Sequence, residues 1–149
     1  MRFLHSMLRV RNLDDTLSFF CGLLNFKEIK RYDSDEGKFT LVFLHAPGDE
    51  YIQGKTPLIE LTYNWPDENN ETEQYSVGRS FGHLAFEVDN IYDVCEKVQK
   101  SGVVINRPPR DGRMAFLKTP DGISIELLQK GNPLKIKEPW SSMESIGVW

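Results

Sequence analysis

Residues 3–15 read FLHSMLRVRNLDD, and residues 81–93 read FGHLAFEVDNIYD. The two stretches carry phenylalanine, histidine, valine, asparagine and aspartate at matching places, with His5 and His83 separated by 78 residues. In each stretch an alternating, strand-like pattern leads to an asparagine that is typical of a helix N-cap, and apolar residues at helical spacing follow. The chain is therefore predicted to contain an internal repeat whose copies each begin with a strand and a helix.

Three further strand candidates follow each predicted helix. They cover residues 26–32, 39–45 and 58–64 in the first copy, and residues 103–107, 114–119 and 123–129 in the second. The first helix is expected to present Leu13, Leu17, Phe20 and Leu24 on its apolar face. Each copy then has the order β-α-β-β-β, which predicts an α+β fold with one helix against one face of each small sheet.

The predicted organisation is a single domain over residues 1–130 with a tail over residues 131–149. The first copy covers about residues 1–64 and the second about residues 81–130. The linker between them, about residues 65–80, is rich in aspartate, glutamate and asparagine and is expected to be an exposed loop. The tail contains two tryptophans, so we expect it to be extended and to pack on the body of the protein.

Composition excludes several classes of function. The 149 residues include 18 basic and 22 acidic side chains, and a net charge of −4 argues against nucleic acid as the main partner. No apolar run approaches the roughly 20 residues of a membrane span. Both cysteines, Cys21 and Cys95, fall in helix-like segments, so a disulfide framework is not expected and a cytoplasmic location is the prediction.

The reactive side chains also occur in pairs. Two of only three histidines, His5 and His83, occupy the same place in the two copies. Glu60 and Glu126 are single carboxylates inside the apolar final strand of each copy, where an unpaired charge is unfavourable. If the copies pack with approximate two-fold symmetry, these side chains form a cluster of two histidines and two glutamates. Such a cluster suits Zn²⁺, Ni²⁺, Co²⁺, Mn²⁺ or Fe²⁺.

Strand parity supports this cluster. Alternation puts His5 opposite the apolar residues Leu4, Leu8 and Val10, which are expected to face the helix. The same rule puts both glutamates and His83 on the faces turned away from the helices. The alternative is structural: a lone histidine is more often a core or surface residue, and a strand glutamate is often a cross-strand ion-pair partner. His45 has no counterpart in the second copy and is interpreted as structural or surface.

Several segments resemble glyoxalase I (lactoylglutathione lyase), a family of the vicinal oxygen chelate superfamily. They are MRFLHSMLRV at 1–10, IELTYNW at 59–65, FGHLA at 81–85 and PDGISIEL at 120–127. The resemblance implies the glyoxalase/bleomycin-resistance/extradiol-dioxygenase fold, with two βαβββ modules and a metal site on the concave sheet faces. It also implies a homodimer whose active sites lie between subunits.

The resemblance further implies the reaction and the residues that carry it out. The implied reaction is isomerisation of the glutathione–methylglyoxal hemithioacetal to S-lactoylglutathione, through an enediolate stabilised by one divalent ion. Glu126 would be the main base, with Glu60 its counterpart. The implied metal ligands are His5, Glu60, His83 and Glu126; the implied glutathione contacts are Arg9, Asn64 and Arg79, with a further basic contact from Arg110 or Arg113. A histidine at the first ligand position resembles nickel-type enzymes, whereas the acidic linker and the loop 107–113 resemble the zinc type.

Two other readings remain open at this point. One is another vicinal oxygen chelate enzyme, either an extradiol dioxygenase, which uses two histidines and one glutamate on Fe²⁺, or an epimerase. The fourth ligand and the Tyr63-Asn64-Trp65 stretch argue against these enzymes. The other reading is a metal-poor small-molecule binding module, which is disfavoured because all four candidate ligands are present.

Overall fold

The computed structural model describes residues 1–76 and 78–148, and the chain divides into two compact units, Met1–Ser76 and Val77–Trp149. The elements of the first unit are β1 (His5–Arg9), α1 (Leu13–Leu17), the π-helical segment η1 (Ser18–Leu23), β2 (Lys27–Ser34), β3 (Phe39–His45) and β4 (Leu58–Asn64). Its sheet has the order β1-β4-β3-β2, in which β1 is parallel to β4 and the other pairs are antiparallel.

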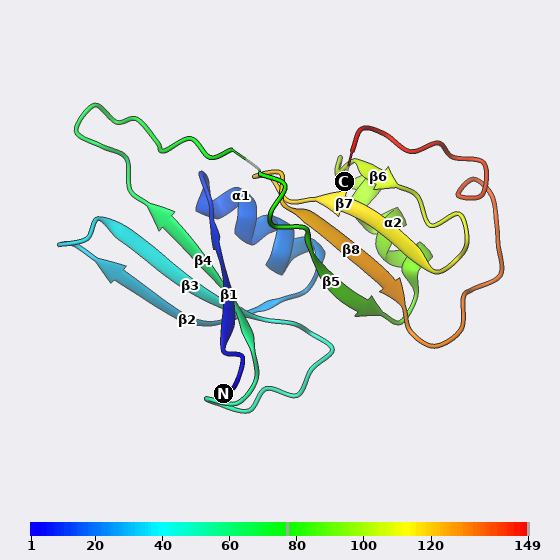
Figure 1. Cartoon of the computed structure of the whole chain (residues 1–149), viewed down its shortest axis with the longest axis horizontal. Coiled ribbons are helices and arrows are strands. Elements are labelled where there is room, and N and C mark those ends of the chain that lie inside the picture. The colour runs from blue at the N-terminus through cyan, green and yellow to red at the C-terminus, as the bar shows by residue number, and fades with distance from the viewer. Residues whose placement is uncertain (77, 149) are drawn as a thin grey trace. The chain divides into compact units, whose positions relative to one another are not determined.

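The second unit repeats this arrangement. Its elements are β5 (His83–Val88), α2 (Ile91–Lys100), β6 (Ile105–Arg107), β7 (Met114–Lys118) and β8 (Ser124–Gln129). Its sheet has the order β5-β8-β7-β6, in which β5 is parallel to β8 and the other pairs are antiparallel (Figure 1). The predicted repeat and the α+β class are therefore confirmed. Among the described residues, no helix combines the length and apolar character needed to cross a membrane.

Asparagine side chains begin both helices, as the sequence predicts. The Asn12 side chain accepts a hydrogen bond from the backbone N–H of Asp15 at 3.1 Å. The Asn90 side chain accepts from the N–H groups of Tyr92 at 3.1 Å and Asp93 at 3.3 Å. These bonds satisfy N–H groups that have no partner within the first helical turn, so each helix starts at a fixed residue directly after its strand.

The first helix departs from the expected regular pattern. It is α-helical only to Leu17 and continues as the π-helical segment η1. Thr16, Phe19 and Phe20 are buried, whereas Leu17 and Leu24 are only partly buried. The predicted apolar face was therefore wrong in part: a π turn holds more residues than an α turn, so Phe19 and Phe20 both reach the core.

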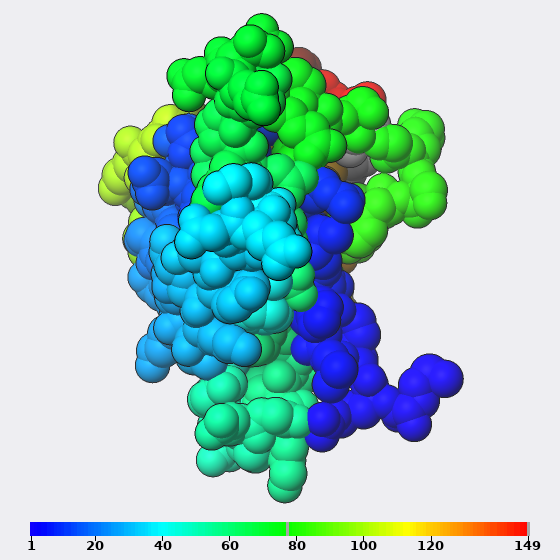
Figure 2. Space-filling model, turned by 90° about the vertical axis from the view of Figure 1, so that its left-hand side faces the viewer, coloured from blue at the N-terminus to red at the C-terminus, as the bar shows by residue number. Residues whose placement is uncertain are grey.

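The register of the strands explains which sheet face is buried. Leu61 lies between Leu8 and Val42 on the neighbouring strands, and all three are buried. In the second unit Leu127 likewise pairs with the buried Ala115. One exception concerns Leu4, which was expected to face the helix. It precedes β1 and is exposed, in an N-terminal segment that projects from the first unit (Figure 2).

The two cysteines are expected to differ in reactivity. Cys95 is completely buried on α2, and burial raises the pKa of its thiol to about 12. Cys21 is only partly buried, although burial and the nearby Glu28 charge also raise its thiol pKa. Because the thiolate is the reactive form, a disulfide reagent at pH 8 should modify Cys21 slowly and leave Cys95 intact. Peptide mass spectrometry identifies the modified residue. Equal labelling of both cysteines in the folded protein would contradict this burial, and unfolding in guanidinium serves as the control.

The C-terminal segment packs on the helix of the second unit. Trp140 is buried and stacks on Tyr92 of α2, with ring centroids 6.4 Å apart. The Tyr92 hydroxyl donates to the Lys135 carbonyl at 3.2 Å, and the Lys137 ammonium lies 4.6 Å from the centroid of the same ring. The other tryptophan of this segment, Trp149, lies outside the described residues.

A close backbone contact holds the start of this segment. The Leu134 N–H donates to the Gly112 carbonyl at 3.0 Å, and a Cβ on Gly112 would lie 2.2 Å from the Leu134 carbonyl oxygen. Gly112→Ala is therefore expected to lower the free energy of unfolding by about 2–4 kcal/mol, since it adds this clash to the strain of a positive φ. Gly131 has a similar positive φ with open space around it, so Gly131→Ala should lower the free energy of unfolding by only about 1 kcal/mol. Urea unfolding measures both, and equal losses would contradict the contact.

Candidate active site

The two histidine–glutamate pairs predicted from the repeat are present, one in each unit. In the first unit β1 lies beside β4, and His5 Nε2 is 3.0 Å from Glu60 Oε2. In the second unit β5 lies beside β8, and His83 Nε2 is 3.1 Å from Glu126 Oε2. Each pair arises because parallel neighbouring strands place alternate side chains on one face, opposite the helix.

The surroundings of the two pairs also match. Phe43 lies opposite the first glutamate in register, and its ring is edge-on to His5 at 6.1 Å. Phe116 lies opposite the second glutamate, and its ring is edge-on to His83 at 5.3 Å. The glutamate side chains are 13% and 14% exposed, against 41% and 42% for the histidines. Each carboxylate is thus shielded, while each imidazole stays open to an approaching group.

The donor atoms fit a divalent transition metal. Two ligands that each lie about 2.1 Å from one ion are about 3.0 Å apart when they subtend a right angle. Both observed separations match this distance, which also suits a hydrogen bond between imidazole and carboxylate. Among the described residues, no group of three or more histidine, cysteine, aspartate or glutamate side chains could hold a metal ion. Each pair could therefore offer two ligands to an ion.

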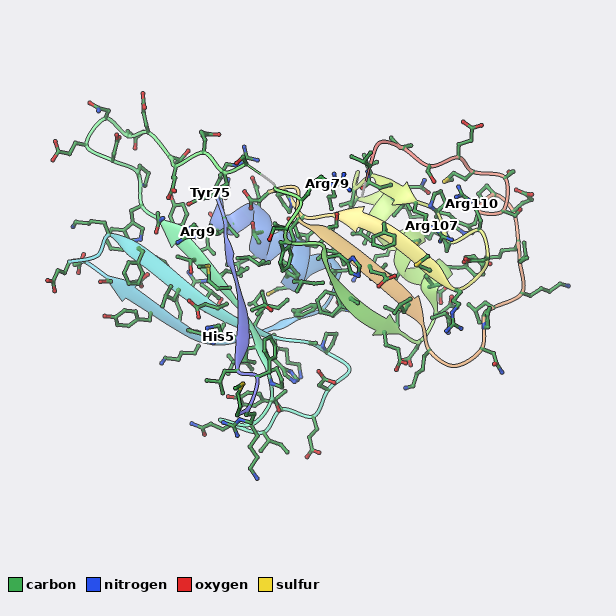
Figure 3. All side chains as sticks on the ribbon, in the orientation of Figure 1. His5, Arg9, Tyr75, Arg79, Arg107 and Arg110 are labelled. Atoms are coloured by element: carbon green, nitrogen blue, oxygen red, sulfur yellow. The ribbon has the colours of Figure 1, made fainter. Side chains whose placement is uncertain are left out.

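Two of the expected glutathione contacts lie at one end of the first sheet. Arg9 is the last residue of β1, and Asn64 is the last residue of β4. The Asn64 amide donates to Glu73 Oε2 at 2.7 Å, and the Tyr75 hydroxyl donates to the same oxygen at 3.1 Å. Burial and the Glu73 carboxylate raise the pKa of Tyr75, while the Asn64 hydrogen bond and the Arg9 charge oppose the rise. Figure 3 shows Arg9 and Tyr75 at this end, with His5 further along β1.

Glu73 and Tyr75 were not predicted from the sequence. Both lie in the linker after β4, where no strand or helix periodicity indicates which side chains turn toward the sheet. The linker is otherwise mostly exposed, as expected.

The remaining arginine candidates have different surroundings. The Arg110 guanidinium donates to the Met143 carbonyl at 3.0 Å and to Ser145 Oγ at 3.2 Å, so it holds the C-terminal segment. Arg113 and Arg79 are exposed, and within residues 1–76 and 78–148 neither side chain makes a hydrogen bond or ion pair. Figure 3 shows Arg110 and Arg79 on separate parts of the second unit.

The third histidine lies apart from the pairs. His45 ends β3, is buried, and packs edge-on against Tyr51 with ring centroids 5.3 Å apart. Its Nε2 atom has no hydrogen-bond partner among the described residues. The structural interpretation of His45 is therefore supported over a surface position.

Comparison with known proteins identifies the family. Residues 2–127 match the sequence profile of the Glyoxalase/Bleomycin resistance protein/Dioxygenase superfamily. The chain belongs to this superfamily. Among its relatives is the lactoylglutathione lyase of Neisseria meningitidis serogroup A, which is 42% identical over 135 residues, covering 87% of this chain and 91% of that protein. A probable lactoylglutathione lyase of Synechocystis is 37% identical over 134 residues, covering 87% and 95%.

Solved structures of superfamily members agree with this assignment. The trypanothione-dependent glyoxalase I of Leishmania major is 33% identical, covers 87% of each chain and has a TM-score of 0.76. Glyoxalase I from Zea mays is 30% identical with a TM-score of 0.70, and the match covers 88% of this chain and 45% of the maize chain. The resemblance to glyoxalase I and the predicted fold are therefore confirmed.

Proposed function

We propose that this protein is a glyoxalase I, a lactoylglutathione lyase that converts the glutathione–methylglyoxal hemithioacetal into S-lactoylglutathione. The activity removes methylglyoxal. The observation that carries the proposal is the duplicated histidine–glutamate pair, with the same spacing, shielding and aromatic neighbour in both units. Within the superfamily we choose this reaction because relatives that match nearly nine-tenths of the chain are lactoylglutathione lyases.

His5, Glu60, His83 and Glu126 would together hold one divalent ion. Two imidazole nitrogens and two carboxylate oxygens suit Ni²⁺ or Zn²⁺ and leave coordination positions for water or substrate. The bound ion supplies Lewis-acid stabilisation of the negative charge that develops on the substrate oxygens.

Glu126 is the proposed base. The reaction removes a proton from the carbon that bears sulfur and adds a proton to the neighbouring carbonyl carbon, which turns the hemithioacetal into a thioester. A carboxylate within reach of both carbons can accept the proton and return it. Glu126 is suited to this task because its side chain is 14% exposed, so solvent exchange with the transferred proton is limited. Glu60 occupies the corresponding place in the other pair.

Arg9, Asn64 and Arg79 are the proposed glutathione contacts. Glutathione carries two carboxylates, which guanidinium and amide groups recognise by charge-assisted hydrogen bonds. Arg113 is preferred to Arg110 as a further contact, because the Arg110 guanidinium is occupied by the C-terminal segment. We place the enzyme in the cytoplasm as a homodimer with active sites between subunits. The exposed apolar side chains of Phe3, which precedes β1, and of Met7, which alternates with His5 on β1, support an association of this kind.

Product analysis tests the proposed reaction. The metal-loaded protein, incubated with methylglyoxal and glutathione, should produce a thioester with the mass of S-lactoylglutathione. The same incubation with 2-mercaptoethanol in place of glutathione should give almost none, because that thiol lacks the groups that the arginines recognise. Folded, metal-loaded protein that forms no thioester, or that cleaves a catechol ring when loaded with Fe²⁺, would overturn the proposal in favour of another superfamily reaction.

A further inference from the structure

The linker after β4 places a carboxylate of the protein itself on the proposed substrate contacts. Glu73 Oε2 accepts hydrogen bonds from the Asn64 amide at 2.7 Å and from the Tyr75 hydroxyl at 3.1 Å. Arg9 ends β1 at the same end of the sheet, and its positive charge opposes the rise in the pKa of Tyr75. An amide N–H and a phenol O–H therefore converge on one carboxylate oxygen, and Arg9 lies at the same end of the sheet.

These donors form an anion-binding site, which is occupied by the protein's own Glu73 carboxylate. Asn64 and Arg9 are two of the groups proposed to bind glutathione, whose recognition depends on carboxylates. A substrate carboxylate and the Glu73 carboxylate need the same donors and carry the same charge, so they cannot occupy the site together.

We propose that Glu73 is a specificity-determining residue that competes with the substrate carboxylate for Asn64 and Tyr75. This inference rests on the proposed function. Substrate binding displaces the Glu73 side chain, after which the Tyr75 hydroxyl donates to the substrate. Tyr75 is thereby a further substrate-binding residue. Thiols that carry no carboxylate at this position do not displace Glu73, so Asn64 and Tyr75 remain hydrogen-bonded to it.

The position of Glu73 allows this exchange. Its side chain is exposed, so its carboxylate regains water when it leaves. The adjoining turn is held separately, because Asp67 accepts hydrogen bonds from the N–H groups of Asn69 and Glu71, both at 2.9 Å. Release of Glu73 therefore need not unfold the turn that precedes it.

The test compares Glu73→Gln with Glu71→Gln. Glutamine at position 73 can still accept from Asn64 but lacks the charge, so it should compete less well. We expect KM for the hemithioacetal to fall about three- to fivefold, the range for an exposed charged contact, with the effect on KM rather than kcat. Glu71→Gln removes the same charge two residues away in the linker, where the backbone N–H and carbonyl of Glu71 are hydrogen-bonded to Asp67. It should leave KM unchanged.

Binding of S-methylglutathione, measured by calorimetry on the metal-loaded protein, separates the two proposals. If the wild type neither binds this ligand nor forms product, the proposed function fails and this inference falls with it. If the wild type binds and turns over normally, tighter binding by Glu73→Gln alone supports the competition. The inference is overturned if Glu73→Gln binds S-methylglutathione no more tightly than the wild type, or if Glu71→Gln gains the same affinity. Either result leaves the proposed function intact.

Discussion

Replacing Glu126 with glutamine is expected to lower kcat by about a hundred- to ten-thousandfold, the contribution of a positioned general base. Glutamine keeps the size of the side chain beside His83 and Phe116 but cannot accept the proton. The measurement is kcat at saturating hemithioacetal. Metal content has to be measured on the same sample, because Glu126 is also a proposed metal ligand.

Two further variants make this prediction specific. Glu96 lies on α2 in the same unit and is exposed, with its carboxylate 2.7 Å from the Lys100 ammonium. Glu96→Gln should therefore keep nearly all activity. Glu60→Gln tests the division of roles between the two pairs. If Glu126→Gln retains both its metal and its activity, Glu126 is not the base, and a larger loss in metal-loaded Glu60→Gln would give that role to Glu60.

Removal of the metal is expected to have an effect of similar size. A chelator should reduce activity by more than about a hundredfold, because a positioned cation is worth several kcal/mol to a reaction that builds negative charge on oxygen. Added Ni²⁺ or Zn²⁺ should restore it, and the better ion identifies the metal class. Mg²⁺ should not restore it, because imidazole nitrogens are poor ligands for that ion.

Circular dichroism before and after chelation shows whether the fold survives. Each unit has its own sheet and buried core, so we expect little change in the spectrum. A protein that remains fully active after its metal has been removed would contradict the role assigned to the four side chains.

Much of the fold could be predicted because strand geometry is rigid. The strands at 39–45 and 58–64 occur at their predicted bounds, since alternation and chain-breaking residues define both. The helix starts at Leu13 and Ile91 followed from the asparagine caps. The π-helical segment η1 could not be predicted, because Phe19 and Phe20 fit either helix type and tertiary packing decides between them.

In the candidate site, too, contacts between strands could be predicted, whereas contacts made by loops could not. The contact of His5 with Glu60, and of His83 with Glu126, follows from the repeat together with the two-residue period of a strand. The contact of Glu73 with Asn64 could not be predicted, because the linker sequence has neither helix nor strand periodicity. The Arg110 contact with Met143 also escaped prediction, because it joins residues 33 positions apart through a segment without regular structure. Long-range contacts of loops depend on packing that a local sequence pattern does not encode.

We propose that both histidine–glutamate pairs contribute to one metal site. Metal content per chain, measured by mass spectrometry after equilibrium with limiting and excess Ni²⁺ or Zn²⁺, tests it directly. We expect one ion per chain in the wild type and near-complete loss of that ion in both His5→Ala and His83→Ala, since each would remove a ligand from the proposed shared site. Two ions per chain, or one ion retained in either variant, would show that the pairs act separately and would contradict a shared metal site.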